Sequence, residues 1–248
     1  MVIGKSEIDK NMPVVIFCGG YGSRIREETT DKPKPMINIG RFPVLWHIMK
    51  IYNHYGFNNF ILTLGYKGDY VRNYLKKSSG KIFSDFNITC VDTGESTKTG
   101  GRLKLCEKYL GNKNFFCTYG DGVSDVNLID LLNFHKSFNK IAGTITGVKI
   151  PHKFGIISYT KRGKLKKYQK GHLMDEPINA GFMVLEREYL DYLNLECEVE
   201  EPFNILAGKN KMAVFNHDGF FGAFDTHRDL KDLNDQWEKS PKWRVWKD

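Results

Sequence analysis

The chain has 248 residues, of which 41% are hydrophobic, and this is enough to bury one large core. Its formal net charge is +8, but the lysines are scattered apart from a short cluster at residues 161–167, so a solvated surface explains them better than a nucleic-acid interface. No segment approaches the roughly 18 uninterrupted apolar residues of a membrane span, and residues 1–13 lack the apolar core of a signal peptide. We therefore expect a single cytoplasmic domain, residues 1–248, that has no nucleic-acid partner and no membrane span.

The first half of the chain alternates between strand and helix patterns. Residues 13–18 form a continuous apolar run, typical of a strand that is covered on both faces of a parallel sheet. Residues 43–56 place apolar side chains at helical spacing and stop at a glycine. Further strands are expected at residues 57–66, 87–94, 114–122 and 141–150, and further helices at residues 67–77, 100–111 and 126–138, the last of these capped by Asp125. This alternation predicts a doubly wound, mostly parallel α/β sheet, whose ligands lie beyond the carboxyl ends of the strands.

The second half is less regular. Short strands are expected at residues 154–160, 164–170, 178–186 and 211–217, and they suggest a smaller antiparallel lobe that receives a second substrate. The nucleotide-binding part would then cover about residues 13–150 and the acceptor-binding part about residues 151–248. The end of the chain starts as a helix near residue 227, and Trp237, Trp243 and Trp246 are expected to act as packing anchors. Aromatic residues of this tail, if exposed, would also suit a homo-oligomeric interface.

The five cysteines are expected to be free thiols, because their number is odd and their spacing is wide. Neither they nor the histidines show the spacing of a metal site.

A glycine-rich turn follows the first strand. Gly19, Gly20 and Gly22 allow the backbone N–H groups to approach phosphate oxygens, and Arg24 and Lys34 add positive charge nearby. A plain strand-to-helix turn would explain the glycines alone, but the cations favour a phosphate site. The turn lacks both the third glycine of a dinucleotide fingerprint and the GK[ST] ending of a P-loop.

Two aspartates follow apolar runs. Asp121 lies between glycines that expose its carboxylate, which suits Mg²⁺, although Asp before Gly is also an ordinary turn. Asp225 precedes the last helix, where it could equally be an N-cap. The order of the residues alone leaves both pairs of alternatives open.

Three further residues are ambiguous in the same way. Lys170 follows Lys166 and Lys167 in a basic turn, and Asn179 and Gly181 are compatible with a tight turn that enters a strand.

Six motifs taken together resemble the sugar nucleotidyltransferases, particularly the glucose-1-phosphate cytidylyltransferases. The motifs are FCGGYGSRIREET, KPKPM, PVLWHIMKIYNHYG, VDTGESTKTGGRL, TYGDGVSDV and HDGFFGAFDTHRD, and they span nearly the whole chain. The resemblance implies a Rossmann-like α/β fold. It also implies transfer of CMP from CTP to a phosphomonoester, with release of pyrophosphate, for cell-surface polysaccharide biosynthesis.

The resemblance also implies roles for individual residues. Arg24 and Lys34 would be the catalytic cations that stabilise charge on the reacting phosphates, and Mg²⁺ would be the cofactor. The phosphates of the nucleotide would be bound by Gly19, Gly20, Gly22 and Ser23, and its base would be bound by Thr99, Gly100, Gly101 and Arg102. The metal would be bound by Asp121 and Asp225. The acceptor would be bound by Lys170, Asn179 and Gly181.

The acceptor region departs from the family pattern. Many relatives carry Glu-Lys-Pro where this chain has Gln169, Lys170 and Gly171. Similar cytidylyltransferases activate non-sugar phosphates, such as phosphocholine or, in CTP:phosphoglutamine cytidylyltransferase, the phosphoglutamine used for capsule synthesis. A sugar 1-phosphate and a small non-sugar phosphate both stay open, as do UTP and dTTP in place of CTP. Two other classes are a metal-dependent glycosyltransferase and a non-catalytic nucleotide-binding module.

Overall fold

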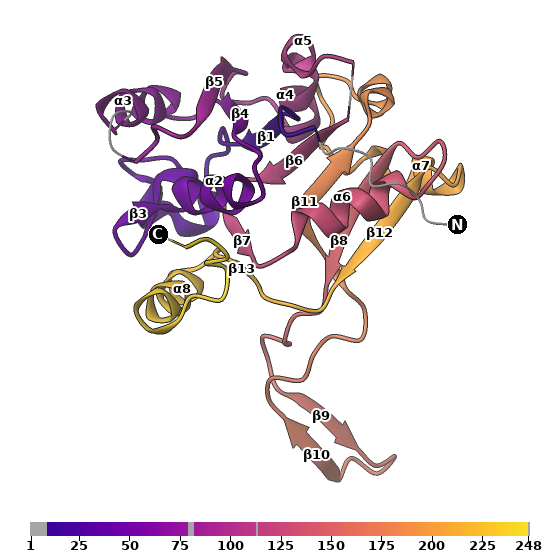
Figure 1. Cartoon of the computed structure of the whole chain (residues 1–248). Helices are drawn as coiled ribbons and strands as arrows, with labels where there is room; N and C mark the ends of the chain where they lie inside the picture. Colours follow the sequence, from indigo (N-terminus) through magenta and orange to yellow (C-terminus); the bar gives the residue numbers. More distant parts are fainter. Residues whose placement is uncertain (1–8, 79–81, 113, 248) are drawn as a thin grey trace.

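A seven-stranded sheet forms the centre of the protein, which we describe from a computed structural model at residues 9–78, 82–112 and 114–247 (Figure 1). The strand order is β12-β8-β11-β6-β1-β4-β5. The strands are β1 (Val14–Phe17), β4 (Asn59–Leu64), β5 (Asn87–Asp92), β6 (Phe115–Tyr119), β8 (Gly143–Val148), β11 (Ile178–Leu185) and β12 (Met212–His217).

Most of the sheet is parallel, as the sequence predicted. Strand β1 pairs in parallel with both β4 and β6, so that Val15 lies opposite Ile61 on one side and Cys117 on the other. Every residue of β1 is buried, which is why the run is apolar without alternation. Only β11 runs antiparallel, between β6 and β8, while β12 is parallel to β8. The fold is therefore α/β with one reversed strand.

Two layers of helices cover the two faces of this sheet. One cluster of buried side chains joins α2 (Val44–His54), α3 (Gly68–Ser78) and α6 (Leu128–Lys136) to the face that carries Val14, Ile16 and Phe60. The other joins α4 (Thr99–Leu105), α5 (Glu107–Leu110), the 3-10 helix η3 (Arg187–Tyr192) and α7 (Pro202–Gly208) to the face that carries Val15 and Phe17. All five cysteines are free, as expected, and four of them are buried.

The remaining elements are short, apart from the last helix. They are the 3-10 helices η1 (Ser23–Ile25) and η2 (Lys34–Met36), α1 (Arg26–Thr29), α8 (His227–Lys239), and the paired strands β2 (Asn38–Ile39) with β3 (Phe42–Pro43), β7 (Gly122–Ser124) with β13 (Phe221–Ala223), and β9 (Ile156–Tyr159) with β10 (Leu165–Gln169). None of the helices in the described ranges is long and apolar enough to cross a membrane.

Two expectations for helices were wrong in detail. The helix expected at residues 100–111 is divided into α4 and α5, with Cys106 between them. The cap of α6 is Asn127, whose side-chain oxygen accepts hydrogen bonds from the N–H groups of Ile129 and Asp130. Asp125 accepts hydrogen bonds from the Phe220 N–H and His217 instead, and so joins two distant segments.

The antiparallel lobe is smaller than the sequence suggested. Strands β11 and β12 join the central sheet because their apolar residues complete its core. Only the β9–β10 hairpin stands apart, and it projects away from the body of the molecule (Figure 1). Large apolar side chains on and beside this hairpin are exposed, among them Phe154, Ile157, Tyr159, Leu165 and Tyr168.

The C-terminal tail packs against the first half of the chain. Trp243 and Trp246 are buried, which confirms them as packing anchors. They are therefore not exposed residues that could form a homo-oligomeric interface. Helix α8 begins with a capping box between Thr226 and Asp229. Because Thr226 is the cap, the side chain of Asp225 remains available for other contacts.

Candidate active site

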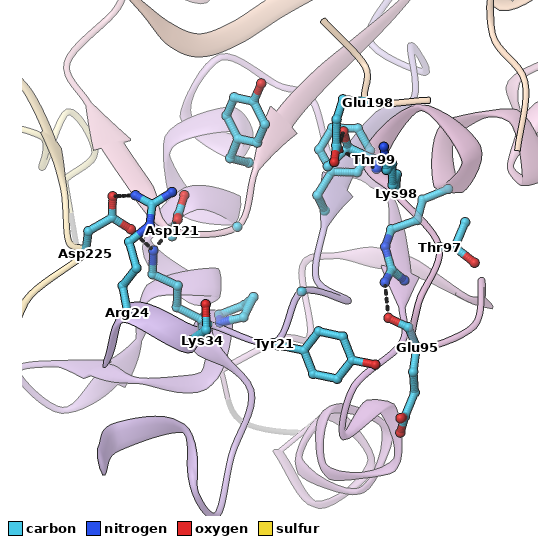
Figure 2. Close-up of a pocket in the computed structure, with 18 of the residues that line it drawn as sticks. Tyr21, Arg24, Lys34, Glu95, Thr97, Lys98, Thr99, Asp121, Glu198 and Asp225 are labelled. Carbon is cyan, nitrogen blue, oxygen red and sulfur yellow. Dashed lines mark hydrogen bonds and ion pairs between the residues drawn. The ribbon is translucent and has the colours of Figure 1, made fainter. Parts of the chain in front are cut away.

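A cavity of about 460 Å³ lies beyond the carboxyl ends of the central strands (Figure 2). Parallel strands place the segments that follow them at one edge of a sheet, so the loop after β1 and the loop after β6 meet here. The residues that line the cavity include residues 20–25 after β1, Lys34, residues 95–99 after β5, Arg102 of α4, Tyr119 and Asp121 at the end of β6, Glu198 and Asp225.

Two cations and two carboxylates meet at one end of this cavity. The Lys34 ammonium donates to Asp121 Oδ2 at 2.6 Å and to Asp225 Oδ1 at 2.7 Å. Arg24 pairs with the other oxygen of Asp225 (Figure 2). Residues that are widely separated in the sequence therefore hold a single cation between two carboxylates.

Lys34 is held in this position by its neighbours in the chain. It opens η2 after the extended Pro33, and the next residues, Pro35 and Met36, are buried. Its side chain is only 13% exposed, and the ammonium lies 5.3 Å from the centre of the Phe224 ring. Burial alone would lower the pKa of Lys34, but the charges and hydrogen bonds of Asp121 and Asp225 raise it above its ordinary value. Lys34 is therefore a permanent cation.

The glycine turn borders the same end of the cavity. Gly22 has φ of 61°, a left-handed conformation that favours glycine, and it directs the chain into η1. Gly20, Gly22, Ser23 and Arg24 line the cavity, whereas Gly19 does not, and its carbonyl oxygen accepts a hydrogen bond from Arg102.

Arg102 is almost completely buried, at 3% exposure, beneath the turn. Its guanidinium donates to the carbonyl oxygens of Gly19, Gly94 and Glu95 at 2.8–3.0 Å, and to Thr93 Oγ1 at 2.6 Å. In this structure Arg102 thus links the glycine turn to residues 94–95, and both of its Nη groups donate to other residues of the protein.

Gly100 and Gly101 do not line the cavity. They lie under the segment of residues 195–199, and their N–H groups donate to the carbonyl oxygen of Cys197. Thr99 does line the cavity, together with Glu198 from that segment. Glu198 was not identified from the sequence, because it belongs to no motif and reaches the cavity only through tertiary packing.

A second cavity of about 230 Å³ adjoins the first and shares Arg24, Tyr119, Asp121 and Asp225 with it. Asn179 lines this second cavity. Its Oδ1 accepts a hydrogen bond from the Gly181 N–H at 2.9 Å, which leaves the side-chain NH₂ group as a donor.

Tyr119 stands at the boundary between the two cavities. Its ring lies so close to Gly181 that a side chain at that position would collide with it, and its hydroxyl donates to Glu200. Tyr119 has no distinctive signal in the sequence, because the TYGDG motif draws attention only to its aspartate.

Lys170 is placed apart from these residues. It is exposed, follows β10 at the end of the hairpin nearest the body, and lines neither cavity. The structure therefore brings together Arg24, Lys34, Asp121, Asp225 and Asn179, but not Lys170.

The carboxylates suit a metal that arrives with phosphates. Among the described residues there is no group of three or more His, Cys, Asp or Glu side chains that could hold a metal ion by themselves. Mg²⁺ usually binds one or two carboxylates together with substrate phosphates and water. Asp121 and Asp225, on either side of one cationic group, fit that donor set.

Comparisons with known proteins identify the family of the chain. The Nucleotidyl transferase family model matches residues 13–218. A glucose-1-phosphate cytidylyltransferase of Salmonella typhimurium is 38% identical over 95% of this chain and 100% of its own length. Mannose-1-phosphate guanylyltransferase 1 of Arabidopsis thaliana is 30% identical over 88% of this chain and 62% of its own length.

The fold is also found in a solved structure. UDP-glucose pyrophosphorylase in complex with UDP-glucose superimposes with a TM-score of 0.71 at 14% identity, covering 92% of this chain and 98% of that one, which shows the shared fold. Because the family model matches residues 13–218, which is most of its length, the chain belongs to the nucleotidyl transferase family.

Proposed function

We propose that this enzyme transfers CMP from CTP to a phosphomonoester and releases pyrophosphate. The observation that carries the proposal is the cluster at the shared boundary of the two cavities, where Lys34 bridges Asp121 and Asp225 beside Arg24. A nucleotide's phosphates in the larger cavity and an acceptor phosphate in the smaller one would meet at this cluster. The choice of CTP comes from the 38% identical cytidylyltransferases.

The reaction needs no general base. A phosphomonoester with a second pKa of about 6 is already a dianion at neutral pH. One of its oxygens forms a bond to the α-phosphorus of CTP, the bond from that phosphorus to the bridging oxygen of the β-phosphate breaks, and pyrophosphate leaves with the electron pair. The barrier lies in bringing two anions together and stabilising the charge that develops, so cations rather than bases are required.

Each residue of the cluster then has a separate task. Lys34, buried and permanently charged, would stabilise the reacting phosphates, and exposed Arg24 would hold the departing pyrophosphate. Asp121 and Asp225 would hold Mg²⁺, which when bound neutralises the charge of the triphosphate. Asn179 would orient the acceptor through its free NH₂ group.

The acceptor follows from the chemistry of the smaller cavity. Amide donors such as Asn179 match hydroxyl oxygens, so we propose a sugar 1-phosphate as the first candidate. Phosphocholine and phosphoglutamine are the alternatives, because Gln169 replaces the glutamate that many relatives carry next to Lys170. The role in cell-surface polysaccharide biosynthesis that the family resemblance implies is part of the proposal.

A pyrophosphate-release screen tests the proposal directly. The purified protein with Mg²⁺ is offered CTP, UTP, dTTP and GTP, each with glucose 1-phosphate, other sugar 1-phosphates, phosphocholine and phosphoglutamine. We expect pyrophosphate only when a nucleotide and an acceptor are both present, with CTP as the preferred nucleotide.

Two other outcomes would overturn the proposal. A metal-dependent glycosyltransferase would release CDP from a CDP-sugar and no pyrophosphate from CTP. A non-catalytic module would bind CTP, detectable by calorimetry, without turnover of any pair.

A further inference from the structure

The larger cavity has two chemically different ends (Figure 2). Arg24, Lys34, Asp121 and Asp225 lie at one end, which the proposed function gives to the phosphates. Residues 95–99 and Glu198 lie across the cavity at the other end. A nucleotide with its phosphates at the first end must place its base at the second.

Glu198 is brought to the base end by a close contact between two backbone segments. The Gly100 N–H donates to the Cys197 carbonyl oxygen at 3.0 Å, and the Val199 N–H donates to Thr99 Oγ1 at 2.8 Å. A Cβ atom on Gly100 would lie 2.6 Å from Cys197 Sγ, and one on Gly101 would collide with the Leu195 carbonyl oxygen. The two glycines therefore seat residues 195–199 against α4.

The carboxylate of Glu198 is also fixed in orientation. Its Oε2 accepts hydrogen bonds from the Thr99 N–H at 3.2 Å and from the Thr99 hydroxyl at 2.7 Å. Both of the hydrogen bonds that the described residues donate to this carboxylate go to Oε2. Oε1 can therefore accept hydrogen bonds from a ligand. An ionised carboxylate only accepts hydrogen bonds.

We infer that Glu198 selects a base with an exocyclic amine, and so selects cytosine over uracil. The inference rests on the proposed function. Cytosine presents an N4 amino donor where uracil presents the O4 acceptor. A fixed carboxylate attracts the N4 amine of cytosine and repels the O4 carbonyl oxygen of uracil, whereas the O2 atom, the ribose and the phosphates are the same in the two nucleotides. A site that hydrogen-bonds one group discriminates strongly against the analogue that lacks it.

Glu95 is the competing acid at this end of the cavity. Its carbonyl oxygen is bound by Arg102, but its side chain points away from Glu198 (Figure 2). No described residue fixes the Glu95 carboxylate, so we assign the selection to Glu198 rather than to Glu95.

The test substitutes Glu198→Gln, which keeps the size of the side chain. The glutamine oxygen can still accept from Thr99, but its NH₂ group then faces the base. We expect the ratio of kcat/KM for CTP to that for UTP to fall at least tenfold, with part of the change a gain for UTP. Calorimetric titration with CTP and UTP should show the same shift in Kd without any turnover. Glu196→Gln, on the same segment but outside both cavities, is the matched control.

Three outcomes separate the inference from the proposed function. If the unmodified enzyme turns over no nucleotide, the proposed function fails. If it prefers CTP and Glu198→Gln leaves the ratio within twofold, the inference fails and the function stands. If Glu95→Gln shifts the ratio instead, Glu198 is not the selecting residue. If Glu198→Gln misfolds, Glu198→Asp serves in its place. The shorter side chain moves the carboxylate away from the base but adds no hydrogen-bond donor. This variant should therefore weaken CTP binding without strengthening UTP binding.

Discussion

The Lys34 ammonium forms ion pairs with Asp121 and Asp225 at the same time, so this one residue holds the two carboxylates of the site together. Asp225 is affected in return. Burial would raise the pKa of Asp225, but Lys34 and Arg24 outweigh it and hold that pKa below its ordinary value. Both carboxylate and ammonium are therefore charged at neutral pH. Under the proposed function, the cations would turn from the aspartates to the phosphates of a bound nucleotide without any change in protonation.

Lys34→Ala should damage turnover far more than folding. Removing a charge that stabilises the reacting phosphates costs about a hundredfold or more in kcat. The measurement is pyrophosphate release at saturating substrates, beside a thermal melt of the same sample. Lys32→Ala removes a nearby lysine that contributes to neither cavity and should keep kcat within about threefold. Equal losses in the two variants would contradict the assigned role.

Because of His47, we expect the free energy of unfolding of the protein to depend on pH. Burial lowers its pKa to about 4. The geometry agrees with a neutral ring, because Nδ1 accepts from the Trp243 indole N–H at 3.4 Å and Nε2 donates to the Ile39 carbonyl oxygen at 2.9 Å. An unfolded histidine has a pKa of about 6.5, so between pH 6.5 and pH 4 the unfolded chain binds the proton more readily than the folded one.

Stability should therefore fall as the pH falls through this window. Between pH 7.5 and pH 5 the loss due to His47 is about 2 kcal/mol. Urea unfolding at both pH values measures it, and His47→Gln, which cannot be protonated, should remove that part of the slope. An unchanged slope in the variant would show that other groups cause it.

At the scale of elements, the junction between α4 and residues 195–199 connects packing to function. The segment contributes Glu198 to the cavity only because two glycines allow the backbones to touch. Arg102 in the same helix ties the glycine turn to residues 94–95. A short helix thus contributes to both ends of the larger cavity.

Gly101→Ala should disturb this junction. The added methyl group collides with a backbone oxygen, and overpacking of this kind costs about 1–3 kcal/mol. Urea unfolding should show that loss, and CTP should bind more weakly in calorimetry. Gly208→Ala, where a methyl group meets nothing within 4 Å, should be neutral or slightly stabilising. If both variants behave alike, the contact is not what requires glycine at position 101.

The same elements show what the sequence could and could not predict. The strand at residues 14–17 was predictable because its residues are apolar without interruption, and the meeting of the loops after β1 and β6 follows from parallel topology. Strands β11 and β12 were recognised as strands, but their short local patterns do not say which sheet they join. Glu198 was missed because a contact between residues 99 and 198 has no local signal. The cap of α6 was misplaced by two residues because Asp125 and Asn127 are both good caps.

At the scale of the whole molecule, the β9–β10 hairpin is the least integrated part. Two strands by themselves are marginally stable in water, and this pair exposes large apolar side chains. Lys170, assigned to the acceptor phosphate by family resemblance, follows this hairpin outside both cavities. That role therefore requires the hairpin to approach the smaller cavity when the acceptor binds.

Lys170→Ala tests this movement. If Lys170 reaches the acceptor phosphate, the variant should raise the acceptor KM about tenfold, because a charge-assisted hydrogen bond is lost. Lys167→Ala, an exposed lysine in β10 of the same hairpin, should leave that KM unchanged. Equal acceptor KM values in the two variants would show that Lys170 does not bind the acceptor phosphate.

The C-terminal tail, in contrast, is part of the core. Trp243 is fully buried and stacks with Phe220 and Trp237. Trp243→Ala should cost about 3–5 kcal/mol and lower the Tm by about 10 °C. Calorimetric melting measures this, with the exposed neighbour Lys242→Ala as the control, and a loss below 1 kcal/mol would mean that the tail is dispensable.

All four tryptophans of the chain surround His47 in this region: Trp46 lies 5.6 Å from Trp246, and Trp237 lies 4.6 Å from the imidazole, measured between ring centres. The tryptophan fluorescence of the protein therefore reports on this region alone. An emission change during denaturation would record the release of the last residues from α2, whereas the melting of the central strands would have to be followed by circular dichroism. Where the two transitions coincide, the tail and the sheet unfold as one cooperative unit.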